Sequence, residues 1–101
     1  MAESEKKSLV VFQNKTIRRI MVNGEWFFSV VDVVRVLTDI PDAGAYWRKL
    51  KQRLSAEGSQ VVTFCHELKL PAADGKNYKT DCANVKGLFR IIQSVPTAGV
   101  A

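Results

Sequence analysis

The sequence predicts a small α+β domain in which two β-hairpins form an antiparallel sheet beside three α-helices. Asn23-Gly24 separates two apolar runs, and it is a strong hairpin signal because both residues tolerate positive φ. Asp74-Gly75 is a second turn signal between strand-like segments. Three further segments repeat apolar residues at helical spacing. A chain of 101 residues is enough for one domain with a thin core.

The chain is expected to begin with a tail and a strand, followed by the first hairpin. Residues 1–8 are charged or small and are predicted to form a disordered tail. An apolar strand follows at 9–12. The hairpin joins strands at 16–22 and 25–28, and the second of these is rich in aromatic residues, which favour a half-buried pleated surface.

A capping box predicts that the first helix follows this hairpin without a linker. The Ser29 hydroxyl can accept from the backbone N–H three residues on, and the Asp32 carboxylate can reach back to the N–H of Ser29. Apolar residues at 30, 33, 34 and 37 then share one helical face. We interpret Asp32 as part of the scaffold, because a carboxylate in the first turn suits the helix dipole.

The second helix is expected at 43–54 with Asp42 as its N-cap. Tyr46, Leu50 and Leu54 recur every four residues beside Trp47 and should face the core. The opposite side carries a basic set that contains no acid: Arg48, Lys49, Lys51, Gln52 and Arg53. Like charges repel along a helix, so a polyanion is the simplest partner to offset that cost. The alternative is an ordinary solvated face.

The second hairpin is predicted from a strand at 61–68, a loop at 71–76 and a returning strand at 77–80. Its tip carries Lys69, Lys76 and Lys79, and therefore resembles a basic wing that could contact a phosphate backbone. The alternative is that this hairpin only closes a small sheet.

The third helix is expected at 83–94, after Asp81 as its cap. Its apolar stripe would consist of Val85, Leu88, Phe89 and Ile92. Pro96 should end the helix, which leaves residues 97–101 as a second disordered tail and 9–96 as the domain.

Composition indicates a polyanionic partner and a reducing compartment. The formal net charge is +5, which favours association with polyanions. Cys65 and Cys82 accompany no secretory segment, so both thiols should be reduced and the protein cytoplasmic. No apolar run approaches the length of a membrane span, so no membrane association is expected.

The residue pattern predicts no enzyme, no metal site and no cofactor. Cys65 and His66 are neighbours in a predicted strand and would point to opposite faces, so they cannot easily form a dyad. Two cysteines and one histidine are too few for a structural zinc site. Asp74-Gly75-Lys76 lacks the spacing of a phosphate-binding loop.

Several motifs together resemble the Bro-N domain, the N-terminal domain of the BRO family and of prophage antirepressors. The resemblance starts at the strand Trp26-Phe27-Phe28, which leads into Val30-Val31-Asp32-Val33 at the start of a helix. It continues through residues 46–51, 68–76, 80–84 and 87–96, and covers about 10–96 in all. The family usually continues into a Trp-containing segment and a variable C-terminal domain, whereas this chain stops at Ala101. Apolar surface left uncovered by that difference would favour a homodimer.

The resemblance implies a DNA-binding module of a regulatory, antirepressor-like protein. Carried over to this chain, it suggests contacts from six cations: Arg18, Arg19, Arg48, Lys49, Lys51 and Arg53. Base readout would come from a helix in the major groove, through Arg48, Lys51 or Gln52.

The alternative function is a protein-interaction module that binds a repressor or another acidic partner. Exposure of part of the aromatic group would favour it, namely Trp26, Phe27, Phe28, Tyr46 and Trp47.

Overall fold

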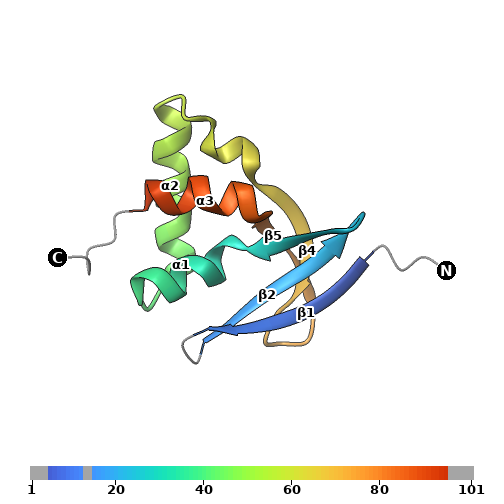
Figure 1. The fold of residues 1–101 in the computed structure, drawn as a ribbon. Coiled ribbons are helices and arrows are strands. Elements are labelled where there is room, and N and C mark those ends of the chain that lie inside the picture. Colours follow the sequence, from blue (N-terminus) through green and yellow to red (C-terminus); the bar gives the residue numbers. More distant parts are fainter. Residues whose placement is uncertain (1–4, 13–14, 96–101) are drawn as a thin grey trace.

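A computed structural model describes the backbone of residues 5–12 and 15–95, with side chains from 16 to 95 (Figure 1). Its elements are, in chain order, β1 (Glu5–Phe12), β2 (Lys15–Val22), β3 (Glu25–Ser29), α1 (Val30–Thr38), α2 (Ala43–Ala56), the short 3₁₀-helix η1 (Gln60–Phe64), β4 (His66–Pro71), β5 (Asn77–Ala83) and α3 (Val85–Ser94). Residues 5–8, assigned to the tail from sequence, form the start of β1. The remaining tail residues, 1–4 and 97–101, lie outside the described residues.

The strands form one antiparallel sheet in the order β1-β2-β3-β5-β4, which confirms the predicted α+β class. Asn23 and Gly24 have φ values of 51° and 80°, as the Asn-Gly hairpin requires. The two hairpins are joined through two residue pairs only, Phe28 with Ala83 and Ser29 with Cys82. This short connection lets the sheet change direction between β3 and β5.

The sheet curls so that the two hairpins enclose a small apolar cluster. Ile20, Leu70 and Cys82 are buried there, with Phe27 packed against them. β2 and β4 contact each other although they are not neighbours in the sheet order. In Figure 1 the β4–β5 hairpin accordingly crosses behind β2.

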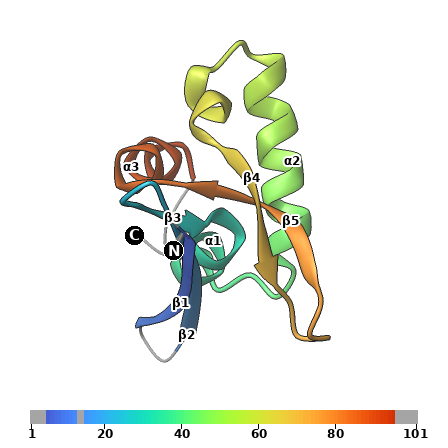
Figure 2. The same cartoon turned by 90° about the vertical axis from the view of Figure 1, so that its right-hand side faces the viewer.

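The main core lies between the three helices and the end of β5. Leu50 and Leu54 of α2 and the neighbouring Trp47 are at most 7% exposed, as predicted, and they pack with Val34 and Ile91. Tyr46, expected with them, is half-buried at the edge of this core. Figure 2 shows α1, α2 and α3 gathered around this core, with β1 and β2 extending away from it.

Two helix starts agree with the sequence, whereas one predicted core residue does not. The Ser29 side chain accepts from the N–H of Asp32, and the Asp42 side chain accepts from the N–H of Ala45. Leu37, expected on the buried face of α1, lies in the last turn of that helix and is 36% exposed.

The strand predicted at 61–68 is wrong in its first half, because residues 60–64 form η1. The Ser59 side chain caps this turn by accepting from the N–H of Val61, and the Thr63 hydroxyl donates to the carbonyl of Gln60. These local bonds satisfy the backbone without a neighbouring strand. Val61 and Val62 pack against the helical core instead.

The cap predicted for α3 is also wrong, and the predicted buried face is right only in part, because Leu88 and Ile92 are half-buried. Asn84 is the N-cap and accepts from the N–H of Gly87, whereas Asp81 remains within β5. The buried residues of α3 are Gly87 and Ile91. Val85 and Phe89, expected in the core, are 57% and 63% exposed.

Candidate nucleic-acid interface

A groove of about 300 Å³ separates α2 from the β4–β5 hairpin. Figure 2 shows β5 passing beside α2. The walls of the groove come from α2 and the β4–β5 hairpin, the two elements that the sequence marked as basic, and from Arg18 of β2. The polar and charged residues that line it are Arg18, Arg48, Lys51, Glu67, Lys79, Thr80 and Asp81. The tertiary structure therefore brings part of the predicted basic helix and part of the predicted basic hairpin to one site.

Asp81 holds the two walls of this groove together. Its Oδ2 accepts from the Trp47 indole N–H at 2.8 Å and from the Lys51 Nζ at 2.7 Å. The Asp81 side chain is only 12% exposed, whereas that of Lys51 is 37% exposed, so the carboxylate is buried and the ammonium group reaches it from the surface. Lys51 is therefore an ion-paired residue that sets the distance between α2 and β5.

Other cations at the groove lack a carboxylate partner. Arg48 and Lys79 form no ion pair with any residue whose side chain the structure describes. Lys79 lies directly opposite Lys69 in the β4–β5 register, and like charges in such a cross-strand pair repel each other. An anion placed beside Lys79 and Arg48 would relieve that repulsion.

The hairpin tip is ordered by Asp74, which accepts from the Tyr78 hydroxyl and from the N–H of Lys76. These hydrogen bonds, that of Tyr78 first, lower the pKa of Asp74. The tip thus keeps a defined shape, and its Ala72 and Ala73 line the cavity beside Arg18 and not the groove. Lys76 is exposed there but does not line the groove.

Three predicted residues on α2 lie outside the groove. Lys49, Gln52 and Arg53 are all exposed, and none of them lines the groove. The helix therefore divides its cations between two sides, because Arg48 and Lys51 are three residues apart and Lys49 and Arg53 are four apart on the other flank.

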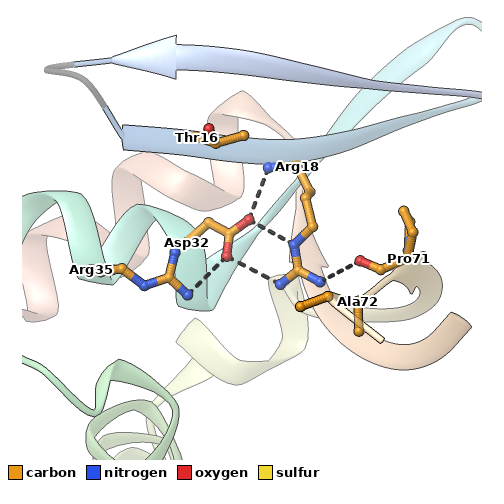
Figure 3. Close-up of a pocket in the computed structure, with 7 residues that line it drawn as sticks. Thr16, Arg18, Asp32, Arg35, Pro71 and Ala72 are labelled. Carbon is orange, nitrogen blue, oxygen red and sulfur yellow. Dashed lines mark hydrogen bonds and ion pairs between the residues drawn. The ribbon is translucent and has the colours of Figure 1, made fainter. Parts of the chain in front are cut away.

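Arg18 connects β2, α1 and β4 in a second cavity of about 330 Å³ (Figure 3). The carboxylate of Asp32 accepts from the backbone N–H, Nε and Nη2 of Arg18, at 2.8, 2.8 and 3.1 Å. Arg18 Nη1 donates to the carbonyl of Pro71 at 3.0 Å, where β4 enters the turn of the second hairpin. The hydrogen bond to Asp32 raises the pKa of Arg18.

Sequence reasoning missed this arrangement around Asp32. The carboxylate was predicted to bond the N–H of Ser29, but it is occupied by Arg18 and by Arg35, whose Nη2 lies 3.3 Å away. The sequence did contain a signal, because Asp32 stands alone within a run of valines. In the structure Asp32 is only 2% exposed. A carboxylate buried in this way requires a cationic partner.

Arg19, the neighbour of Arg18 in β2, points to the opposite face of the strand. Its guanidinium lies 3.8 Å from the centroid of the Trp26 ring, in cation–π geometry. The two arginines that the sequence grouped together thus have different surroundings. Trp26 itself is half-buried, as are Phe27, Phe28 and Tyr46, whereas Trp47 is fully buried.

The thiols are protected rather than activated. Burial raises the pKa of Cys65 to about 11 and that of Cys82 to about 12. His66 is exposed and packs edge-on against Phe27, with ring centroids 5.3 Å apart. Within residues 16–95, no three His, Cys, Asp or Glu side chains gather as metal ligands would. In the part of the chain that the structure describes, no helix has the length and apolar character to cross a membrane.

The family model of the BRO family N-terminal domain, Bro-N, matches residues 16–100. The chain belongs to the BRO family. Bro-N domains are DNA-binding N-terminal domains of phage and prophage antirepressor-like proteins. The Bro-N match includes both groove walls and the Arg18–Asp32 pair, whereas β1 precedes it. No curated protein and no solved structure matches the chain.

Proposed function

We propose that this Bro-N domain binds duplex DNA through the groove between α2 and the β4–β5 hairpin. The observation that carries the proposal is the convergence of Arg48 and Lys79, from two separate elements, on one groove where neither has a described carboxylate partner. The family's DNA-binding character supports the same assignment.

Lys79 and Lys69 supply phosphate contacts from the hairpin, and Arg48 supplies one from α2. Such contacts give affinity and orientation but carry no sequence information. Gln52 lies one turn from Arg48 on the exposed side of α2, so α2 in the major groove could place this amide at base edges. Lys49, Arg53 and Lys76 remain candidates for further phosphate contacts.

Arg18 and Lys51 act in this proposal as positioning residues. Arg18 anchors the turn end of the hairpin at Pro71, and Lys51 ties α2 to β5 through Asp81. The DNA-contacting cations are therefore presented by a rigid frame, which reduces the ordering cost of binding. We propose an antirepressor-like regulatory role in the cytoplasm, without catalysis.

The test is a DNA-binding titration with a labelled random-sequence duplex at low salt, followed by fluorescence anisotropy. We expect Arg48→Glu and Lys79→Glu each to weaken binding by at least about tenfold, because each replaces a phosphate contact by a repulsive charge.

The matched control is Lys86→Glu on α3, which makes the same change in net charge at an exposed site outside the groove. We expect it to weaken binding by less than about threefold. Equal losses in all three folded variants would show that net charge alone attracts DNA, and absence of binding by the unchanged protein would refute the proposal altogether.

A further inference from the structure

The outer face of α3 carries an apolar surface that no described residue covers. Phe89 is 63% exposed and Val85, one turn earlier, is 57% exposed. Leu88 and Ile92 are half-buried at its edge. The four residues form a continuous stripe at the spacing by which one amphipathic helix recognises another.

The exposure of this stripe is imposed by the packing of Gly87. A Cβ atom at position 87 would lie 2.9 Å from the Cβ of Phe64 and 3.2 Å from that of Ala83. α3 can therefore approach η1 and β5 this closely only with Gly87 turned inward. Residues two positions away lie about 200° around a helix, so Val85 and Phe89 must point outward.

The charges that α3 itself carries are all positive, and the nearest carboxylate for which a contact is seen, that of Glu25, accepts from Asn84 Nδ2 at the start of the helix. α3 contains Lys86 and Arg90 but no acidic residue. Arg90 lies 5.7 Å from the centroid of the Phe64 ring, and neither cation is paired with a carboxylate of the described residues. A second copy of this helix would bring cations against cations, whereas an acidic partner would neutralise them.

We infer that α3 is a docking surface for an amphipathic helix of another protein, with an apolar face against Val85 and Phe89 and acidic residues beside Lys86 and Arg90. This surface is separate from the proposed DNA groove, because no α3 residue lines that groove. Figure 2 shows α3 on one side of the molecule and α2 on the other, with β5 running from beside α2 to α3.

The test uses the whole chain and two synthetic amphipathic helices. Both peptides carry leucines on one face, and their flanks are glutamate in one and lysine in the other. Affinity is measured by anisotropy, and the surface is located from amide chemical shifts. We expect the glutamate peptide to bind at least about tenfold more tightly than the lysine peptide, with the largest shifts in α3.

Substitutions then separate this surface from the rest of the molecule. We expect Phe89→Ser to weaken binding of the glutamate peptide at least about tenfold, because the substitution removes the most exposed apolar side chain of the stripe. Leu37→Ser, at an exposed leucine of α1, should leave that affinity within about twofold. Lys86→Glu should weaken binding of the glutamate peptide and strengthen binding of the lysine peptide. Unfolding of the variant could not produce this reversal.

Three results would overturn the inference. These are equal affinity for the two peptides, a Phe89→Ser effect no greater than that of Leu37→Ser, and self-association of the chain that Phe89→Ser abolishes in sedimentation velocity. The last would assign the face to a second copy. Phe89→Ser should leave DNA affinity unchanged, so a loss there would instead assign the face to DNA.

Discussion

At the scale of single residues, Asp32 has the greatest structural consequence. Its buried carboxylate holds Arg18 through both the backbone and the guanidinium, and Arg18 in turn holds Pro71. Three elements that are distant in sequence thus depend on one charge. Removing that charge leaves the Arg18 guanidinium, whose side chain is 24% exposed, without its counter-ion.

We expect Asp32→Asn to lower the free energy of unfolding by about 3 kcal/mol, the usual cost of breaking a buried ion pair from one side. The measurement is urea denaturation followed by circular dichroism.

Arg35→Met is the matched control for this prediction, because Arg35 contacts the same carboxylate with a side chain that is 42% exposed. Arg35→Met should lower the free energy of unfolding by less than about 1 kcal/mol, as is usual for exposed ion pairs. Similar losses in both variants would mean that Asp32 contributes only through ordinary surface electrostatics.

At the scale of elements, one glycine decides how α3 is oriented. Hydrophobic periodicity predicted the stripe that contains Val85 and Phe89 as the buried face. Gly87 and Ile91 occupy that position instead, because the missing side chain of Gly87 lets the helix approach Phe64 and Ala83 closely. Steric fit at one position therefore outweighed the amphipathic pattern.

We expect Gly87→Ala to destabilise the fold by about 1–3 kcal/mol, because the added methyl group overpacks the contact with Phe64. Gly44→Ala is the matched control near the start of α2. Its nearest atoms would be at ordinary contact distance, 3.7 and 3.8 Å.

Because alanine is the better helix former, Gly44→Ala should be neutral or stabilising by up to about 1 kcal/mol. Both variants can be compared by their urea midpoints. A neutral Gly87→Ala would show that α3 can shift, and it would remove the packing argument for the outward orientation of Phe89.

At the scale of the whole molecule, the surplus cations are neither evenly dispersed nor all available. Arg18 and Lys51 are neutralised by Asp32 and Asp81, and they serve as structural ties. Arg48 and Lys79 at the α2–hairpin groove form no ion pair with a described residue, and neither does Lys69, which lies opposite Lys79 in the hairpin but does not line the groove. Effective charge toward DNA is thus smaller than the formal net charge of +5 suggests.

We expect the logarithm of DNA affinity to fall with the logarithm of salt concentration at a slope of about −3, from about −0.9 for each of three phosphate contacts. Arg48→Glu combined with Lys79→Glu should reduce this slope to about −1. The measurement is an anisotropy titration at several salt concentrations. A flat dependence would be incompatible with phosphate contacts in the groove.

Local sequence patterns correctly predicted the fold class, the Asn23-Gly24 hairpin, the caps at Ser29 and Asp42, and most of the buried face of α2. These features depend on neighbours within a few residues, where backbone geometry and periodicity act directly. Tertiary structure alone decided that residues 60–64 form a 3₁₀ turn, that Arg18 and Lys51 are ion-paired, and that Phe89 points outward. The physical reason is that ion pairs and close packing depend on contacts between residues that are distant in sequence. Local periodicity does not predict those contacts.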